Sequence, residues 1–329
     1  MAVTIKEVAE AAQVSPSTVS RVLAGNPRIS EETKKKVMKA VKVLNYHPNA
    51  IARSLANKST NTLGVILPSS NEDLFRNPFF IQALTGISIY AKKVGYYIMY
   101  TYSRSEEEEI KIIDNYYNSK LVDGMILLTS RQEDKTIEHI KQIGLPFVVI
   151  GKTDDIEHDL WTDNDNFKAM RDIVIHFIEK GHRNIGFVGG PLNMRMSRDR
   201  LEGYISALQE NNIEINKEYI VEMAEFTEEC GYSASEKLIS KEELSCIVTT
   251  DDLLAFGVLK YFKENRRRDM TVSGFNNTPL AEYQSPPLTS VNINANELGY
   301  NAAKLLISAL KGSREEKNYI IVDTEIVRR

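Results

Sequence analysis

The fold is decided first by residues 4–23, which read TIKEVAEAAQVSPSTVSRVL. Thr4 and Glu7 have the spacing of a capping box, in which a hydroxyl and a carboxylate satisfy the free amides at a helix N-terminus. This spacing predicts a helix directly after Thr4. Ser15 suits the cap of a second helix, and Pro16 fits its first turn because that position needs no amide donor. Two helices joined by a three-residue turn are typical of a helix-turn-helix.

The second helix is expected to have one apolar face and one polar face without acidic residues. Its apolar stripe is Val19, Val22 and Leu23, which leaves the hydroxyl side chains and Arg21 on the outer face. In a helix-turn-helix the second helix enters the major groove of DNA, where an arginine suits bidentate contact with guanine. The alternative is a generic three-helix bundle, completed by a third helix that Ser30 caps.

Charge is divided unevenly along the chain. Residues 1–60 hold ten Lys or Arg and four acidic residues, a net charge of +6. Of the 41 basic and 45 acidic residues in the whole chain, 31 and 41 remain for the rest, a net charge of −10. A basic head on an acidic body indicates an anionic partner for the head, and nucleic acid is the first candidate.

The composition excludes several protein classes. With 329 residues, 42% hydrophobic and 26% charged, the chain has the profile of a globular protein of two or three domains. No apolar run approaches the ~18 residues of a membrane span, and no signal-peptide pattern is present, so we expect a cytoplasmic protein without a membrane partner. The two cysteines, Cys230 and Cys246, lack metal-ligand spacing, so no disulfide, metal site or cofactor is expected.

Residues 48–61 connect the head to the body. The stretch 49–56 has helical character, but eight residues are too few to be stably helical alone in water. We expect a hinge helix that folds on DNA, with Leu55 as an apolar wedge for a base step in the minor groove. The alternative is a linker with an incidental leucine.

From residue 62 onward, short apolar runs alternate with amphipathic helical patterns. The expected strands are 63–67, 97–102, 124–129, 147–150, 184–188, 246–250 and 271–275. The expected helices include 78–94, 106–119, 167–180, 198–211, 253–265 and 296–311. This alternation predicts an α/β body of two lobes with parallel sheets, helices on both faces, and ligands outside the carboxyl ends of the strands.

Candidate catalytic groups are sparse. The five histidines have no Ser or Cys nucleophile motif beside them, and the glycines at 189–191 lack the spacing of a phosphate-binding loop. Asp251 follows a predicted strand without a companion acid cluster, which favours binding of a hydroxyl over a metal ion. We therefore expect no enzyme.

Residues 4–23 and 44–55 together resemble the head and hinge of the lactose/galactose-repressor family of bacterial transcriptional regulators. The body is similar along nearly its whole length, in the motifs at 63–66, 77–80, 163–166, 181–190, 198–204 and 286–291. Within that family, SGFNNT at 273–278 and NINANELGYNAAKLL at 292–306 are most similar to maltose-operon repressors.

The resemblance implies a homodimer that binds a pseudo-palindromic operator in double-stranded DNA and has a body like a periplasmic sugar-binding protein. The implied divisions are a head at 1–47, a hinge helix and linker at 48–61, and a body at 62–329. The N-lobe takes about 62–161 and 291–320, and the C-lobe takes about 162–290 and 321–329. The crossings between lobes are expected near 161–163, 289–291 and 319–322.

The resemblance also implies site residues, position by position. The implied DNA contacts are Thr4, Ser15, Ser17, Thr18, Ser20, Arg21, Tyr46, Asn49, Arg53 and Leu55. The implied effector contacts are Asn77, Phe79, Trp161, Arg198, Phe226, Asp251, Asn276 and Asn277. Core packing is the alternative for the two phenylalanines, a surface salt bridge for the arginine, and packing at the crossing for the tryptophan.

The implied function is a repressor of a sugar-utilisation operon that a sugar, maltose or a maltodextrin, releases from its operator. The same architecture acting with a corepressor or another sugar-derived effector stays open. A sugar-binding protein or an enzyme without a DNA role is the more distant alternative.

Overall fold

The computed structural model describes residues 3–23, 25–47, 59–68, 77–241, 243–267, 270–313 and 316–329. The chain divides into two compact units, Met1–Thr60 and Asn61–Arg329. Each unit has a hydrophobic core of its own.

The first unit contains three helices, α1 (Ile5–Ala12), α2 (Pro16–Leu23) and α3 (Glu31–Val43). The predicted capping box starts α1, since the Thr4 hydroxyl accepts from the Glu7 amide and the Glu7 carboxylate accepts from the Thr4 amide, at 3.4 and 2.7 Å. The turn after α1 is made at Gln13, whose φ of 54° is left-handed. The core between the helices consists of Val8, Ala9, Ala12, Val19, Val22, Val37 and Ala40.

The N-lobe of the second unit is built on a six-stranded parallel sheet of order β11-β5-β4-β3-β1-β2. Its strands are β1 (Thr62–Pro68), β2 (Tyr97–Ser103), β3 (Gly124–Leu127), β4 (Phe147–Ile150), β5 (Leu160–Asp163) and β11 (Tyr319–Ile321). Its helices are α6 (Pro78–Val94), α7 (Glu106–Asn118), α8 (Lys135–Ile143) and α13 (Ala295–Leu310).

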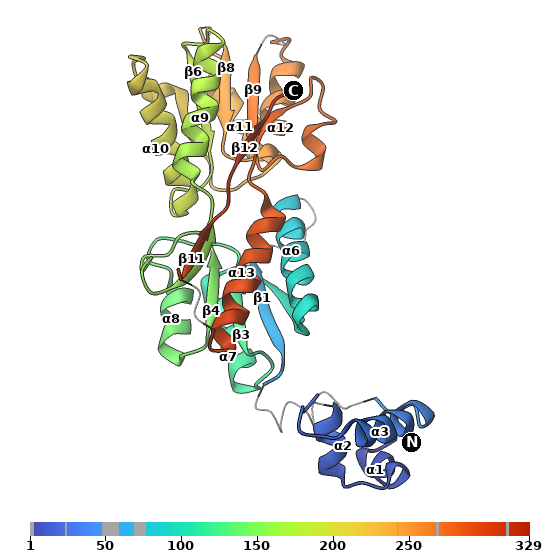
Figure 1. The fold of residues 1–329 in the computed structure, drawn as a ribbon. Coiled ribbons are helices and arrows are strands. Elements are labelled where there is room, and N and C mark those ends of the chain that lie inside the picture. Colours follow the sequence, from blue (N-terminus) through green and yellow to red (C-terminus); the bar gives the residue numbers. More distant parts are fainter. Residues whose placement is uncertain are drawn as a thin grey trace. The chain divides into compact units, whose positions relative to one another are not determined.

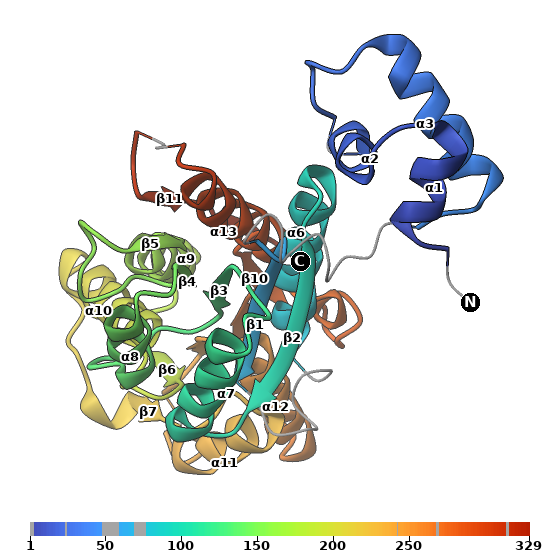
Figure 2. The ribbon, with the colours of Figure 1, turned by 90° about the horizontal axis from the view of Figure 1, so that it is seen from below.

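Helices cover both faces of this sheet because its strands are apolar on both sides. In β1, Leu63, Val65 and Leu67 join the cluster under α6 and α13, whereas Ile66 joins the cluster under α7 and α8. Figure 2 shows α6 and α13 side by side along one face. Gly86 of α6 permits that approach, since a Cβ there would lie 1.8 Å from the Asn296 carbonyl oxygen.

The C-lobe repeats the arrangement with a sheet of order β12-β10-β9-β8-β6-β7, in which only the β10–β12 pairing is antiparallel. Its strands are β6 (Ile185–Gly189), β7 (Ile220–Glu222), β8 (Cys246–Thr249), β9 (Thr271–Phe275), β10 (Thr289–Asn292) and β12 (Glu325–Val327). Its helices are α9 (Asn166–Glu179), α10 (Arg195–Glu210), α11 (Glu228–Leu238) and α12 (Asp252–Glu264), with 3-10 turns at Lys217–Tyr219 and Pro279–Ala281.

The chain passes between the lobes three times, after β5, after β10 and after β11 (Figure 1). Residues 161–163 and 289–291, where two crossings were expected, are still strand residues of β5 and β10. The crossings therefore lie at 164–165, 293–294 and 322–324, slightly later than expected. Within the described residues, no helix has the length and apolar character needed to span a membrane.

Candidate functional site

A cavity lies between the two lobes, at the carboxyl ends of the parallel strands. Its space is about 720 Å³, part of which is open to solvent. Polar groups reach it from the residues that follow β3, β4 and β5 in the N-lobe and β8 and β9 in the C-lobe. This is the edge at which α/β folds bind ligands.

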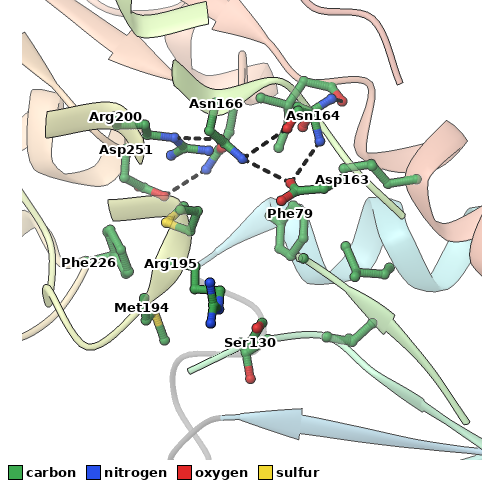
Figure 3. A pocket seen from close by; sticks show the side chains of 18 of the residues that line it. Phe79, Ser130, Asp163, Asn164, Asn166, Met194, Arg195, Arg200, Phe226 and Asp251 are labelled. Carbon is green, nitrogen blue, oxygen red and sulfur yellow. Dashed lines mark hydrogen bonds between the residues drawn. The ribbon is translucent and has the colours of Figure 1, made fainter. Parts of the chain in front are cut away.

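One wall of the cavity is a chain of buried polar side chains centred on Arg200 (Figure 3). The Arg200 Nε donates to Asn166 Oδ1 at 2.9 Å, and its Nη1 donates to the Thr250 carbonyl at 2.6 Å. Its guanidinium also stacks on the Phe275 ring, 3.7 Å from the ring centroid. Asn166 in turn bonds to Asp163, since the Asn166 Nδ2 donates to Asp163 Oδ1 at 2.9 Å.

Burial shifts the ionisation of these groups towards their neutral forms. Burial, and then repulsion from Asp252, raise the pKa of Asp251 from 3.8 to about 7. Burial raises the pKa of Asp163 to about 6, and it lowers that of Arg200 to about 10. The cavity thus holds a permanent cation between two carboxyl groups that exchange protons near neutral pH, and all three can hydrogen-bond a neutral hydroxylated ligand.

The facing wall is apolar and aromatic. It carries two half-buried rings, Phe79 from the N-lobe and Phe226 from the C-lobe. The Phe226 ring packs against Gly190, where a Cβ would lie 2.1 Å from the nearest ring atom. An aromatic wall opposite a polar one suits a sugar ring, which has an apolar face and a rim of hydroxyls.

The rim of the cavity is closed by contacts between the lobes. The backbone amide of Gln132 donates to the Asn193 carbonyl at 2.9 Å, beside an antiparallel bridge between Arg131 and Met194. The Lys152 ammonium pairs with Asp199 at 3.1 Å. Arg195 pairs with Asp154 in the same region. These contacts hold the 193–199 segment of the C-lobe over the N-lobe side of the cavity.

The N-lobe part of this rim is braced from beneath by a buried ion pair. The Arg131 guanidinium donates to both carboxylate oxygens of Glu109, at 2.8 and 3.0 Å, and Glu109 is only 4% exposed. The Thr136 hydroxyl donates to the same carboxylate at 2.7 Å. Within the described residues, no group of three His, Cys, Asp or Glu side chains is arranged to hold a metal ion.

Five of the effector residues expected from the sequence line this cavity: Asn77, Phe79, Phe226, Asp251 and Asn276. The Asn276 Nδ2 donates to Asp251 Oδ2 at 2.7 Å, so these two form one polar group at the ends of neighbouring strands. Asn77 caps α6, since its Oδ1 accepts from the Phe79 amide. For the two phenylalanines the core alternative also holds in part, because each packs against a hydrophobic cluster.

Three expected effector residues lie outside the lining of the cavity. Arg198 donates to the Leu192 carbonyl at 2.7 Å and to Gln132, so it supports the rim, and the arginines that line the cavity are Arg195 and Arg200. Trp161 is buried under α7 and α8, on the face of the N-lobe sheet that is turned away from α6 and α13. Its ring stacks on that of Tyr319, with the centroids 4.7 Å apart.

Asn277, the third of these residues, is directed away from the cavity. Its Oδ1 accepts from the Arg329 guanidinium at 2.8 Å, and its backbone amide donates to the Ser290 hydroxyl at 2.9 Å. It therefore fixes the loop after β9. The lining residues that sequence reasoning missed include Lys152, Asp163, Asn164, Asn166, Met194 and Arg200.

In the first unit, α1 and α2 form the expected helix-turn-helix. Ser17, Ser20 and Arg21 are exposed on α2, while Val19 and Val22 are buried beneath them. The Ser15 hydroxyl lies 2.7 Å from that of Ser17 and 2.9 Å from that of Thr18, and it accepts from the Thr18 amide. The N-terminal end of α2 thus presents a cluster of hydroxyls with one arginine a turn later.

The other expected DNA contacts divide into two groups. The side chain of Thr4 is engaged in the cap of α1, and Tyr46 packs against the core of the head. Asn49, Arg53 and Leu55, with the hinge helix that they were assigned to, lie outside the described residues.

Comparison with known proteins agrees with both units. Residues 4–49 match the family model for bacterial regulatory proteins of the lacI family, and residues 174–329 match that for a periplasmic binding protein-like domain. The transcriptional regulator MalR of Streptococcus pneumoniae is 38% identical over 322 residues, which cover 96% of this chain and 95% of MalR. The chain belongs to the lacI family of bacterial regulatory proteins.

Solved structures of lacI-family proteins have the same architecture. A complex of the transcriptional regulator CelR with cellobiose is 28% identical, with a TM-score of 0.78 over 99% of each chain. A lac repressor dimer bound to operator and an anti-inducer is 24% identical, with a TM-score of 0.84 over 100% of this chain and 98% of the other, and shares the fold. This lacI-family member is thus a transcriptional repressor, and its relatives are regulators, not enzymes.

Proposed function

We propose that this repressor controls an operon for sugar use and leaves its operator when a sugar, maltose or a short maltodextrin, enters the cavity between the lobes. The observation that carries the proposal is the cavity itself, with carboxyl groups of raised pKa and amides on one wall and aromatic rings on the other. The relatives named MalR support maltose. The CelR complex with cellobiose supports a disaccharide of some kind.

The proposed mechanism couples the cavity to DNA through a dimer. In the proposed homodimer, each helix-turn-helix reads one half of a pseudo-palindromic operator, with Ser17, Thr18 and Arg21 at base edges. The exposed apolar residues Ile89 and Tyr97, on α6 and β2, give the N-lobe a face for the second copy. Sugar binding releases the operator only if the sugar binds the released state more tightly than the DNA-bound state.

A gel-shift titration at fixed salt tests the proposal, with an operator selected from a random DNA pool by the protein itself. Salt is held constant because phosphate contacts make affinity strongly salt-dependent. We expect maltose to weaken operator binding and cellobiose at the same concentration to have a smaller effect. Unchanged affinity with maltose would refute the assignment of the effector, and tighter binding would identify a corepressor.

A matched pair of variants assigns the response to the cavity. Phe226→Leu removes an aromatic ring that lines the cavity, whereas Phe147→Leu removes a half-buried ring that packs under α7 and α8. We expect the first variant to need several-fold more maltose for release and the second to respond like the wild type. Equal responses in the two variants would place the sugar elsewhere.

A further inference from the structure

The three crossings between the lobes meet at one buried side chain, Asn164. We propose that Asn164 positions the hinge for the effector, its Nδ2 holding the other two crossings together while its Oδ1 receives a hydroxyl of the bound sugar. The inference rests on the proposed sugar response and adds the residue through which the ligand acts on the hinge.

The contacts of the Asn164 side chain span the whole hinge. Asn164 lies in the first crossing, and its Nδ2 donates to the Ile293 carbonyl in the second at 3.0 Å and to the Val322 carbonyl in the third at 2.8 Å. The backbone adds one further tie, from the Val322 amide to the Asp163 carbonyl at 2.9 Å. The Asn294 Nδ2 also joins the second crossing to the third, donating to the Asp323 carbonyl at 2.8 Å, whereas the Asn164 amide bonds to both of the other crossings.

The environment fixes which way the Asn164 amide faces. Both of its close partners are carbonyl oxygens, so the nitrogen must face them and the oxygen must face away. Asn164 is 2% exposed and lines the cavity beside Asp163 and Asn166 (Figure 3). Across the described residues, Oδ1 of Asn164 accepts no hydrogen bond. Because Asn164 lines a cavity that is partly open to solvent, a sugar hydroxyl can replace water as the donor to Oδ1.

This arrangement links the ligand to the motion of the lobes. One bond of the Asn164 Nδ2 joins the first crossing to the second, and the other joins the first to the third. If the lobes rotate, the three crossings must therefore turn together or these bonds must break. A ligand held by Oδ1 therefore strengthens the conformation in which all three crossings are tied. That differential interaction with one state is what allows a ligand to shift an equilibrium.

Asn318 offers a control with the same chemistry in another place. Its Nδ2 also donates to two carbonyls, those of Ile156 at 2.9 Å and Asp159 at 2.6 Å. Asn318 directly precedes β11, and its two partners lie in the segment before β5. Asn318 does not line the cavity. Substituting either asparagine by aspartate keeps the shape and removes both donors.

The experiment measures, on the full-length chain, maltose affinity by calorimetry and operator affinity with and without maltose. For Asn164→Asp and Asn164→Ala we expect maltose affinity to fall about tenfold or more and the maltose-induced change in operator affinity to shrink at least fivefold. For Asn318→Asp we expect both quantities to stay within about twofold of the wild type, with a lower melting temperature.

The outcomes separate this inference from the proposed function. If the wild type ignores maltose and the other sugars tested, both fail. If the wild type responds and the Asn164 variants respond equally, only the role of Asn164 is refuted. Equal losses in Asn164→Ala and Asn318→Asp would show general destabilisation and would also overturn it. The milder Asn164→Ser serves if the first two variants do not fold, and failure of all three to fold shows a purely structural role.

Discussion

Replacing Asp251 with asparagine should change how the stability of the body depends on pH. In the folded chain burial raises the pKa of Asp251 to about 7, against 3.8 for the unperturbed group. Between these values the folded protein binds a proton that the unfolded chain has released, so stability falls as pH rises from about 4 to about 7. At 1.36 kcal/mol for each pKa unit, ionising Asp251 lowers the free energy of unfolding by about 4 kcal/mol.

The Asp251→Asn variant keeps the other interactions of this position. Asp251 caps α12 by accepting from the Leu253 amide at 2.7 Å, and asparagine caps helices about as well. The amide of Asn276 can turn to present its oxygen to the new side chain. We therefore expect the stabilities of wild type and variant to converge only as the pH falls below 3.8, the unperturbed pKa of the carboxyl group. By pH 8.5 the variant should be more stable by up to about 4 kcal/mol.

Urea denaturation of the full-length chain without sugar, followed by circular dichroism at several pH values, measures this difference. Asp163 and Asp252, whose pKa values burial raises to about 6, are present in both proteins. The contribution of Asp163 cancels in the comparison, whereas the repulsion between Asp252 and Asp251 is part of the difference that the substitution removes. Parallel stability profiles for wild type and variant between pH 5 and pH 8.5 would refute the reasoning, since they would mean that Asp251 is ionised at no cost.

The remaining predictions concern the rim, the aromatic wall and the head. Arg131→Met should destabilise the body by about 3 kcal/mol in urea denaturation, because it leaves the Glu109 carboxylate buried without its partner. Gly190→Ala should displace the Phe226 ring and weaken maltose binding in calorimetry, with little change in operator affinity. Arg21→Ala should cost about 1–3 kcal/mol at one operator position and relax specificity there, whereas a uniform loss on all DNA would mean phosphate contact.

Long elements with clear end signals could be predicted from the sequence almost to the residue. The helix at 78–94 starts at Pro78 after the cap at Asn77 and ends at Val94, before Gly95 in the left-handed conformation, so both ends are marked by residue chemistry. The strands β4 and β9 have the expected bounds because continuous apolar runs define them. The strands β7, β11 and β12 have three residues each, too few for any periodic pattern to identify them.

The position of Arg198 outside the lining of the cavity has a specific physical cause. Residues two apart on a helix point in nearly opposite directions, so an Arg-x-Arg motif places one arginine in the cavity and the other outside. Arg200 lies four residues before Tyr204 and seven before Ala207, on the buried stripe of α10, and this spacing was a usable signal. Trp161 was not decidable in the same way, because strand residues alternate between faces and the register depends on neighbouring strands.

The three crossings also set the order in which the protein can be built during its synthesis. The head makes its core within residues 3–47, so it can fold as soon as it leaves the ribosome. The N-lobe starts at residue 62, but its core needs α13 and its sheet needs β11, which ends at Ile321. Its first strands must therefore wait, with the apolar face of α6 uncovered, until nearly the whole chain has been translated. The C-lobe waits just as long, because its sheet needs β12, which ends at Val327, so neither lobe is complete until the other has been almost fully made.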